Sequence, residues 1–363
     1  MSGRKKILFV ASHREGRAPG QRFRFEQYFS FLKDNGFDCE LSYIISADDD
    51  KILYQPGNYF AKYGIHRRAV QTRKNNAVHA NDYDIIFIFR EAMLTKSIRF
   101  EKLFAKSKAK LVFDFDDAIW HLDISDANRM FSWLKNPGKT GDIISLCDLV
   151  FAGNQYLADY ASKFNRNVVI VPTTIDTAEY RRMDVPRDSG KIVIGWSGSL
   201  TTIKHFEHAL PFLRKIKAKY GDRIVIKVIG DSSYRNDELN ITGIAWKRDD
   251  EIKELSSFDI GIMPLPDDEW ANGKCGLKGL QYMALGIPTI MSPVGVNTEI
   301  ISHMKNGCLA SADSEWEECL VRLIESKDLR DQLGQAGAAT VEERYSVNAW
   351  QSQYLKHFQQ LLK

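Results

Sequence analysis

Residues 273–295 read GKCGLKGLQYMALGIPTIMSPVG and form the clearest structural pattern in the chain. A glycine-rich loop that carries Lys274 and Lys278 leads into an apolar helix, which Gly286 and Pro288 end before a buried strand. Unpaired loop amides, lysines and a helix dipole all attract negative charge at a helix N-terminus. The stretch therefore predicts a binding site for a phosphate-rich ligand.

The length and composition indicate a globular chain of two domains. A chain of 363 residues is too long for one ordinary hydrophobic core. Its 44% hydrophobic and 27% charged residues argue against disorder. Apolar runs are shorter than a membrane span, and the N-terminal MSGRKKILFVAS is typical of a first strand rather than a signal peptide.

The cysteine and histidine patterns favour a reducing cytoplasm and no metal site. The five cysteines are scattered, and none belongs to a Cys-x-x-Cys pair. His205 and His208 are three residues apart without other ligand types near them, which is typical of a helix surface. We therefore expect neither a disulfide framework nor a bound metal.

Charge is unevenly distributed along the chain. Residues 1–110 hold 21 Lys+Arg and 12 Asp+Glu, a formal charge of +9, while the remainder is acidic. Aromatic and basic residues interleave at 59–74, which favours an acceptor grip or transient docking on an anionic membrane. A plain solvated surface helix explains the same pattern, and both interpretations stay open.

Alternating strands and helices predict an α/β fold with parallel sheets covered by helices on both faces. We expect a first domain over residues 1–176, a second over 177–345, and a C-terminal helix over 346–363 that packs back toward the first. The polar stretch 179–190 is the best linker candidate. A G-x-G-x-x-G fingerprint is absent, which disfavours a dehydrogenase.

Polar residues follow two strands of the first domain. After the strand at 7–10 comes a loop, SHREGRAPGQRFR, and after the strand at 110–115 come Asp116 and Asp117. Paired carboxylates at the end of a parallel strand lie where α/β active sites gather. A single aspartate there is more often a helix cap, but three aspartates at 114–117 exceed that need.

Several motifs occur in order along the chain: KLVFDFDDAIW (110–120), IGWSGS (194–199), VIGDS (228–232), FDIGIMPL (258–265), the 273–295 stretch, and NGCLA (306–310). With these motifs the chain resembles the retaining glycosyltransferases of family 4. That resemblance implies the GT-B architecture, in which two Rossmann-like domains face a central cleft. It covers essentially the whole chain and is strongest from 192 to 307.

The resemblance implies a hexosyltransferase-type reaction. Such enzymes bind a nucleotide-diphosphate sugar on the C-terminal domain and transfer the sugar, with retention, to a glycan or lipid-linked acceptor on the N-terminal domain. Positive side chains and helix N-termini, rather than a metal, stabilise the leaving diphosphate. It further implies cell-envelope polysaccharide or glycoconjugate biosynthesis at the inner face of the membrane, with no cofactor and no nucleic-acid partner.

The family motifs place the donor-binding residues at Gly198, Ser199, Lys204, Asp231, Trp246, Lys274, Cys275, Gly276, Lys278, Gln281 and Glu299. An arginine of the family pattern is replaced by Ser199, and two glutamates fall on Gly273 and Gln281. We expect Lys274 or Lys278 to replace the arginine on the diphosphate, and Gln281 to bind a ribose hydroxyl. For Glu299, a helix-capping role is an even alternative.

For the acceptor side, the resemblance places binding residues at Arg17, Gly20, Arg22 and Arg24, and catalytic carboxylates at Asp116 and Asp117. These carboxylates would orient or deprotonate the acceptor hydroxyl, or stabilise positive charge on the sugar ring. Because both glutamates are missing, a GT-B protein that binds nucleotide sugar or a partner without transfer remains an alternative. A sugar-nucleotide epimerase on the same fold is disfavoured by the motif order.

Overall fold

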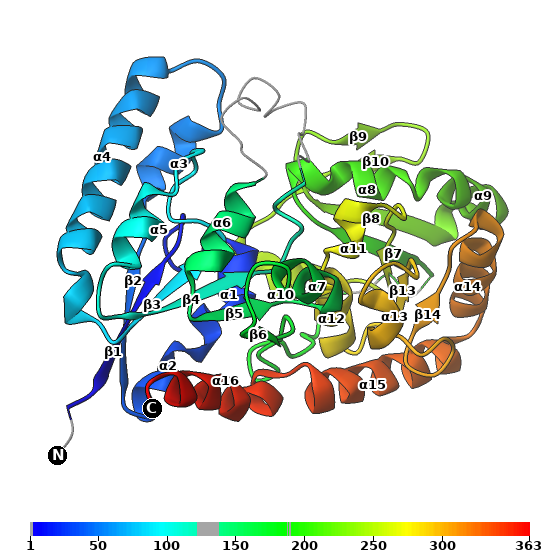
Figure 1. Ribbon diagram of the computed structural model, residues 1–363. Helices are drawn as coiled ribbons and strands as arrows, with labels where there is room; N and C mark the ends of the chain where they lie inside the picture. Colours follow the sequence, from blue (N-terminus) through cyan, green and yellow to red (C-terminus); the bar gives the residue numbers. More distant parts are fainter. Residues whose placement is uncertain (1–2, 122–137, 187, 189) are drawn as a thin grey trace. The chain divides into compact units, whose positions relative to one another are not determined.

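The computed structural model describes residues 3–121, 138–186, 188 and 190–363 (Figure 1). The chain divides into two compact units. The first unit holds Met1–Pro172 with Gln351–Lys363, and the second holds Thr173–Trp350, against the divisions after 176 and 345 expected from sequence. Among the described helices, none combines the length and the apolar composition that a membrane span requires.

The first unit is built on a parallel sheet of six strands in the order β2-β1-β3-β4-β5-β6. The strands are β1 (Lys5–Val10), β2 (Phe37–Ser42), β3 (Ile85–Phe89), β4 (Lys110–Phe115), β5 (Leu149–Ala152) and β6 (Val168–Ile170). The apolar runs in β1, β3 and β5 are buried throughout, as strands covered on both faces require. All six carboxyl ends therefore meet at one edge of the sheet.

Helices connect and cover these strands: α1 (Pro19–Arg24), α2 (Phe29–Asp34), α3 (Ala47–Leu53), α4 (Tyr59–Val78), α5 (Arg99–Phe104), α6 (Lys139–Leu146) and α7 (Gln155–Ala161). Residues 19–24, expected in a loop, are helical because Pro19 is suited to a first helical turn. Phe25 then breaks the helix expected from 25 to 32. Part of the first loop's sequence is therefore helix rather than ligand loop.

The last helix, α16 (Val347–Leu361), begins in the second unit and ends in the first. Its Tyr354 ring stacks on Tyr28 with centroids 4.3 Å apart. Phe358 packs beside Phe87 and Phe151 of the sheet. The C-terminal residues thus complete the core of the first unit.

The second unit contains a six-stranded sheet in the order β11-β8-β7-β12-β13-β14, with parallel pairing between all neighbours. Its strands are β7 (Ile192–Ser197), β8 (Ile224–Gly230), β11 (Ile244–Ala245), β12 (Ile260–Met263), β13 (Thr289–Met291) and β14 (Cys308–Leu309). A small antiparallel hairpin, β9 (Arg235–Asn236) and β10 (Ile241–Thr242), lies outside this sheet. The predicted alternation of strand and helix holds here too.

The helices of the second unit are α8 (Ile203–Glu207), α9 (Leu210–Tyr220), α10 (Arg248–Ser256), α11 (Glu269–Asn272), α12 (Leu277–Ala284), α13 (Asn297–Ile300), α14 (Asp313–Glu325) and α15 (Lys327–Arg344). The single helix expected from 204 to 220 is two helices, because Pro211 lies in a first turn and not in a helix interior. The helix expected from 296 to 304 is only the short α13. Gly286 follows α12 with φ +64°, the left-handed helix end that the sequence predicts.

A buried ion pair joins α1 to the centre of the first sheet. Arg24 and Asp114, the latter on β4, are 1% and 0% exposed. The Arg24 guanidinium donates to both carboxylate oxygens of Asp114, from Nε at 3.1 Å and from Nη2, and to the carbonyl of Val171. Since both charges are paired and hydrogen-bonded, their burial is tolerated.

Replacing Arg24 by Met should destabilise the first unit by about 3–5 kcal/mol, because Asp114 is left as an unpaired buried charge. The double variant Arg24→Met/Asp114→Leu should recover most of this loss, which guanidinium chloride unfolding would measure. Arg4→Met, which removes a 51% exposed arginine paired with Asp38, is the control and should cost under about 1 kcal/mol. Equal losses in Arg24→Met and Arg4→Met would contradict this account.

Candidate functional site

The carboxyl edge of the second sheet contains a backbone contact that requires glycine. The Gly198 amide, after β7, donates to the Ile229 carbonyl of β8 at 2.8 Å. A Cβ on Gly230 would lie 2.4 Å from the Gly198 oxygen, and a Cβ on Gly198 would lie 2.1 Å from the Trp196 ring. Gly230 also has φ +136°, a backbone conformation that other residues avoid. The turn at 198 and the loop at 230 are therefore packed against each other without intervening side chains.

Helix α12 is fixed against this edge by two further close contacts. A Cβ on Gly279 would lie 2.5 Å from the Met291 sulfur, and a Cβ on Gly261 would lie 2.5 Å from the Tyr282 ring. The Tyr282 hydroxyl accepts the Ser197 amide at 2.8 Å and also contacts the Ser197 hydroxyl. Sequence reasoning missed Tyr282 because its partner lies 85 positions away.

The two predicted lysines lie over two different indole rings. The Lys278 ammonium, in the first turn of α12, is 5.5 Å from the ring centroid of Trp196. Lys274 is 4.9 Å from that of Trp270. Because Trp196 also packs on Gly198, Lys278 is held beside the glycine turn. The structure thus places Lys278, from the 273–295 stretch, beside the turn at Gly198. The sequence analysis assigned both of these residues to donor binding.

A buried polar network lies behind α12. Gln281, 5% exposed, donates to the Tyr180 hydroxyl at 3.1 Å and to Glu251 at 3.3 Å. Tyr180 and Trp246 also donate to the Glu251 carboxylate, at 2.5 and 2.8 Å. Two predicted donor residues, Gln281 and Trp246, are therefore joined by Glu251, which sequence reasoning missed. A carboxylate therefore lies behind α12, but it belongs to Glu251 of α10 and not to a residue of α12.

The other predicted donor residues are more dispersed. Ser199 and Lys204 are exposed after β7, and Ser199 binds the Thr202 hydroxyl. Asp231 accepts hydrogen bonds from the amide and hydroxyl of Ser233. Cys275 is 8% exposed, and Gly276 precedes α12 with φ +71°. Glu299 is exposed on α13, a helix of only four residues, so its capping and binding roles both stay predictions.

In the first unit, Arg90 bridges the two predicted catalytic carboxylates. It donates from Nε to Asp116 at 2.8 Å and from Nη2 to Asp117 at 2.6 Å. Arg90 follows β3 with φ +64°, an uncommon conformation for arginine. A Cβ on Gly20 would lie 3.0 Å from Asp116, so α1 closely approaches this cluster. The bridge fixes both aspartates in place and offsets one of their two charges.

The predicted acceptor arginines have separate environments. Arg24 belongs to the buried ion pair with Asp114, and it is too little exposed to contact a ligand. Arg22 is 6% exposed, with its guanidinium 4.9 Å from the Phe23 ring centroid. Arg17 is 37% exposed and pairs with Asp50 at 2.6 Å. Burial therefore argues against a ligand contact for Arg24 and Arg22, while the binding role of Arg17 stays a prediction.

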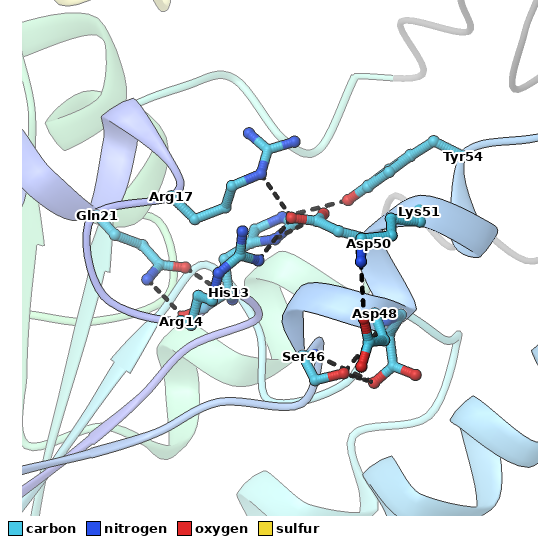
Figure 2. A network of polar contacts seen from close by, with 10 residues as sticks. His13, Arg14, Arg17, Gln21, Ser46, Asp48, Asp50, Lys51 and Tyr54 are labelled. Atoms are coloured by element: carbon cyan, nitrogen blue, oxygen red, sulfur yellow. Dashed lines mark hydrogen bonds and ion pairs between the residues drawn. The ribbon is translucent and has the colours of Figure 1, made fainter. Parts of the chain in front are cut away.

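Figure 2 shows that Arg17 belongs to a polar cluster with His13, Arg14, Asp50 and Tyr54. His13 lies in the loop after β1, and its Nε2 is 3.2 Å from the Tyr54 hydroxyl at the end of α3. Burial lowers the pKa of His13 to about 4; Asp50 opposes this shift, while Arg17 and Arg14 add to it. The imidazole is therefore neutral at physiological pH. His13, Asp50 and Tyr54 were missed because they come from separate segments.

The second unit matches a known family. Residues 191–326 match the family model described as Glycosyl transferases group 1. A 137-residue stretch is 29% identical to an uncharacterised glycosyltransferase of Methanocaldococcus jannaschii and covers 35% of this chain. The chain spans about a third (34%) of that relative's length.

Solved structures share the fold over nearly the whole chain. Sucrose-phosphate synthase from Thermosynechococcus elongatus has a TM-score of 0.71 at 13% identity, with 99% of each chain covered. A glycosyltransferase from Rickettsia africae scores 0.68 at 14% identity, with 99% of each chain covered. Anabaena HepE in complex with UDP-glucose scores 0.67 at 13% identity, covering 98% of this chain and 99% of that one. These likenesses confirm the GT-B fold predicted from the sequence.

The low pKa of His13 predicts a specific acid sensitivity. An unfolded chain protonates His13 near pH 6.5, whereas the folded protein does so near 4. The stability from keeping the imidazole neutral is present above pH 6.5 and is lost as the pH falls toward 4. Urea unfolding should show that His13→Gln loses about 2 kcal/mol less than wild type between pH 7 and 4.5. The exposed His66→Gln is the control; identical losses in all three proteins would contradict the prediction.

Proposed function

We propose that this protein is a retaining glycosyltransferase that moves a sugar from a nucleotide-diphosphate sugar to a glycan or lipid-linked acceptor. The bond from the anomeric carbon to the diphosphate oxygen breaks, and the acceptor oxygen bonds to that carbon on the same face. The departing diphosphate takes the acceptor proton. The match of residues 191–326 to group 1 glycosyltransferases supports the reaction class.

The observation that carries the proposal is the arrangement of Lys278, Trp196 and Gly198. An ammonium group, a glycine turn and the start of α12 gather at the carboxyl edge of a parallel sheet, where α/β proteins bind ligands. A diphosphate gains negative charge as it leaves, and fixed donors stabilise that charge. We assign the diphosphate to this edge, with Lys278 and Lys274 as its cations.

In the first unit, we propose that Asp116 and Asp117 orient the acceptor hydroxyl. Their bridge to Arg90 supports a positioning role, because it fixes the geometry of both carboxylates. The proton then passes to the leaving diphosphate and not to an aspartate. We expect transfer to persist when metal ions are removed with EDTA, since lysines take the role of a metal.

The alternative is a protein that binds nucleotide sugar without transfer. One observation favours it: α12 contains no Asp or Glu, and its Gln281 is buried and hydrogen-bonded to Tyr180 and Glu251. Against it, the lysines and the aspartate cluster are held in defined positions. Turnover of a bound donor separates the two functions.

We further propose that α4 docks on the cytoplasmic face of an anionic membrane, which suits a lipid-linked acceptor in cell-envelope biosynthesis. The first turns of α4 expose Tyr59, Phe60 and Tyr63 at 64%, 96% and 64%. The 20 residues of α4 include no Asp or Glu, and its basic residues Lys62, Arg67, Arg68 and Lys74 reach the surface, whereas Arg73 is buried. Apolar rings beside basic groups match the interface of a negatively charged bilayer.

Replacing Lys278 by Ala should weaken nucleoside-diphosphate binding about 10- to 100-fold, because a charge-assisted contact is worth roughly 1.5–3 kcal/mol. Calorimetric titration with a panel of nucleotides, followed by assays of donor hydrolysis and transfer, measures both steps. Lys219→Ala is the matched control, since Lys219 lies 5.1 Å from the Tyr220 ring centroid on α9. Unchanged affinity in Lys278→Ala would refute the assigned edge, and binding without turnover would favour the alternative.

The double variant Phe60→Ser/Tyr63→Ser should reduce co-sedimentation with phosphatidylserine vesicles about 10-fold, because burying one aromatic side chain contributes roughly 1.5–3 kcal/mol. Val78→Ser, a 75% exposed position at the other end of α4, should bind as wild type does. Binding should also fall with salt. Equal binding to neutral and anionic vesicles would rule out this docking surface.

A further inference from the structure

The cluster in Figure 2 concentrates positive charge at the carboxyl ends of β1 and β2. Arg14 Nη1 and Arg17 Nε both donate to the same oxygen, Asp50 Oδ2, each at 2.6 Å. Burial alone would raise the pKa of Asp50, but these hydrogen bonds bring it below its ordinary value. Two guanidinium groups thus share one carboxylate, and the neutral His13 adds no charge. Arg14, Arg17 and Asp50 together therefore carry one net positive charge.

Among the described residues, Arg14 and Arg17 also have hydrogen-bond donors without a partner. Arg17 contacts Asp50 through Nε, and Figure 2 shows its two terminal nitrogens directed away from that carboxylate. Its side chain is 37% exposed, and that of Arg14 is 34% exposed. A guanidinium fork has the planar geometry that binds two oxygens of a phosphate or carboxylate. Arg17 therefore presents an open oxyanion-binding fork.

The loop after β1 that carries Arg17 is fixed by hydrogen bonds to Gln21 and Glu26. Gln21 accepts the His13 amide at 2.9 Å and donates to the His13 carbonyl at 2.8 Å. Glu26 accepts from Gln21 at 3.0 Å and from the Gly16 amide at 2.8 Å. Binding by a fixed loop avoids the entropy cost of ordering it. The fork is held in place before any ligand arrives.

Two buried polar atoms in the cluster have no hydrogen-bond partner among the described residues. His13 Nδ1 and Asp50 Oδ1 face each other at 4.0 Å, and the Asp50 side chain is 9% exposed. Such unsatisfied atoms cost stability. Beside them, Tyr54 is 58% exposed, so an aromatic ring flanks the fork. Charge, open donors and an aromatic surface together suit an acidic sugar or sugar phosphate.

We propose that Arg14, Arg17 and Tyr54 recognise an oxyanion, a phosphate or a carboxylate, carried by the acceptor. This inference rests on the proposed function and names the chemical class of its acceptor. Arg17 binds the oxyanion, Arg14 contributes charge, and Tyr54 contacts the adjoining ring. Asp50 and His13 position these groups and do not contact the acceptor. The oxyanion belongs either to a water-soluble glycan or to a lipid phosphate.

Nuclear magnetic resonance titration of the arginine side chains in the full-length protein tests this site. The probes are glucose 6-phosphate and glucuronate, with glucose as the neutral counterpart. We expect both charged sugars to shift the Arg17 signal and glucose to leave it unchanged. Arg17→Gln should bind the charged sugars at least about 10-fold more weakly, while Arg4→Gln, an exposed arginine paired with Asp38, should bind as wild type does.

Arg17→Lys keeps the charge and removes the fork, so its affinity should fall between those of wild type and Arg17→Gln. Vesicles that contain phosphatidic acid provide the lipid arm: loss of vesicle binding alone in Arg17→Gln assigns the oxyanion to a lipid, and loss of sugar binding alone assigns it to a glycan. Equal binding of glucose and glucose 6-phosphate, or no effect of Arg17→Gln on any probe, would overturn the proposal.

Nucleotide titration separates this inference from the function on which it rests. Arg17→Gln should bind nucleoside diphosphates as wild type does, because the donor is assigned to the second unit. A wild type that binds no nucleotide would defeat the proposed function and leave the oxyanion result intact. Normal nucleotide binding with no oxyanion selectivity would defeat only the acceptor inference.

Discussion

The second unit depends on a backbone contact that only glycine permits. The loops after β7 and β8 approach so closely that a Cβ on Gly230 would lie 2.4 Å from a carbonyl oxygen. That contact presses Trp196 against the turn, and Lys278 is held over the same indole. The close approach of the two loops and the position of the lysine thus both follow from the absence of two side chains. A larger residue at either glycine would separate the strand ends and displace the lysine with them.

The two units hold their positive charges by different physical means. In the first, arginines are tied to carboxylates: Arg90 to Asp116 and Asp117, and Arg17 to Asp50. In the second, lysines lie above indole rings, which attract a cation without neutralising it. The indole rings therefore position these lysines without cancelling their charge. In the arginine pairs, the carboxylates offset part of the positive charge and fix the geometry of the side chains. Fixed geometry suits the orientation of a polar acceptor.

Much of the fold, but less of the site, could be predicted from the sequence. Apolar runs and helix ends are local patterns, and they indicated the strands around Ile85 and Ile260 and the end of α12. Short-range chemistry also misled, because Pro19 and Pro211 start helices where a loop or a continuous helix was expected. The sequence did not predict roles for Glu251, His13 and Asp50, because these roles depend on partners that are distant in sequence. Tyr180, for example, lies 71 positions from Glu251. Spacing carries no information on such contacts.

Helix α16 has a consequence for the order of events during synthesis. The ring of Tyr354 is 1% exposed and that of Phe358 is fully buried, both within the core formed by the first 172 residues. A ribosome releases the N-terminal strands long before these two rings exist. The first unit must therefore wait, with an apolar surface uncovered, while the whole second unit is translated. The end of the chain, and not its beginning, sets when the N-terminal core closes.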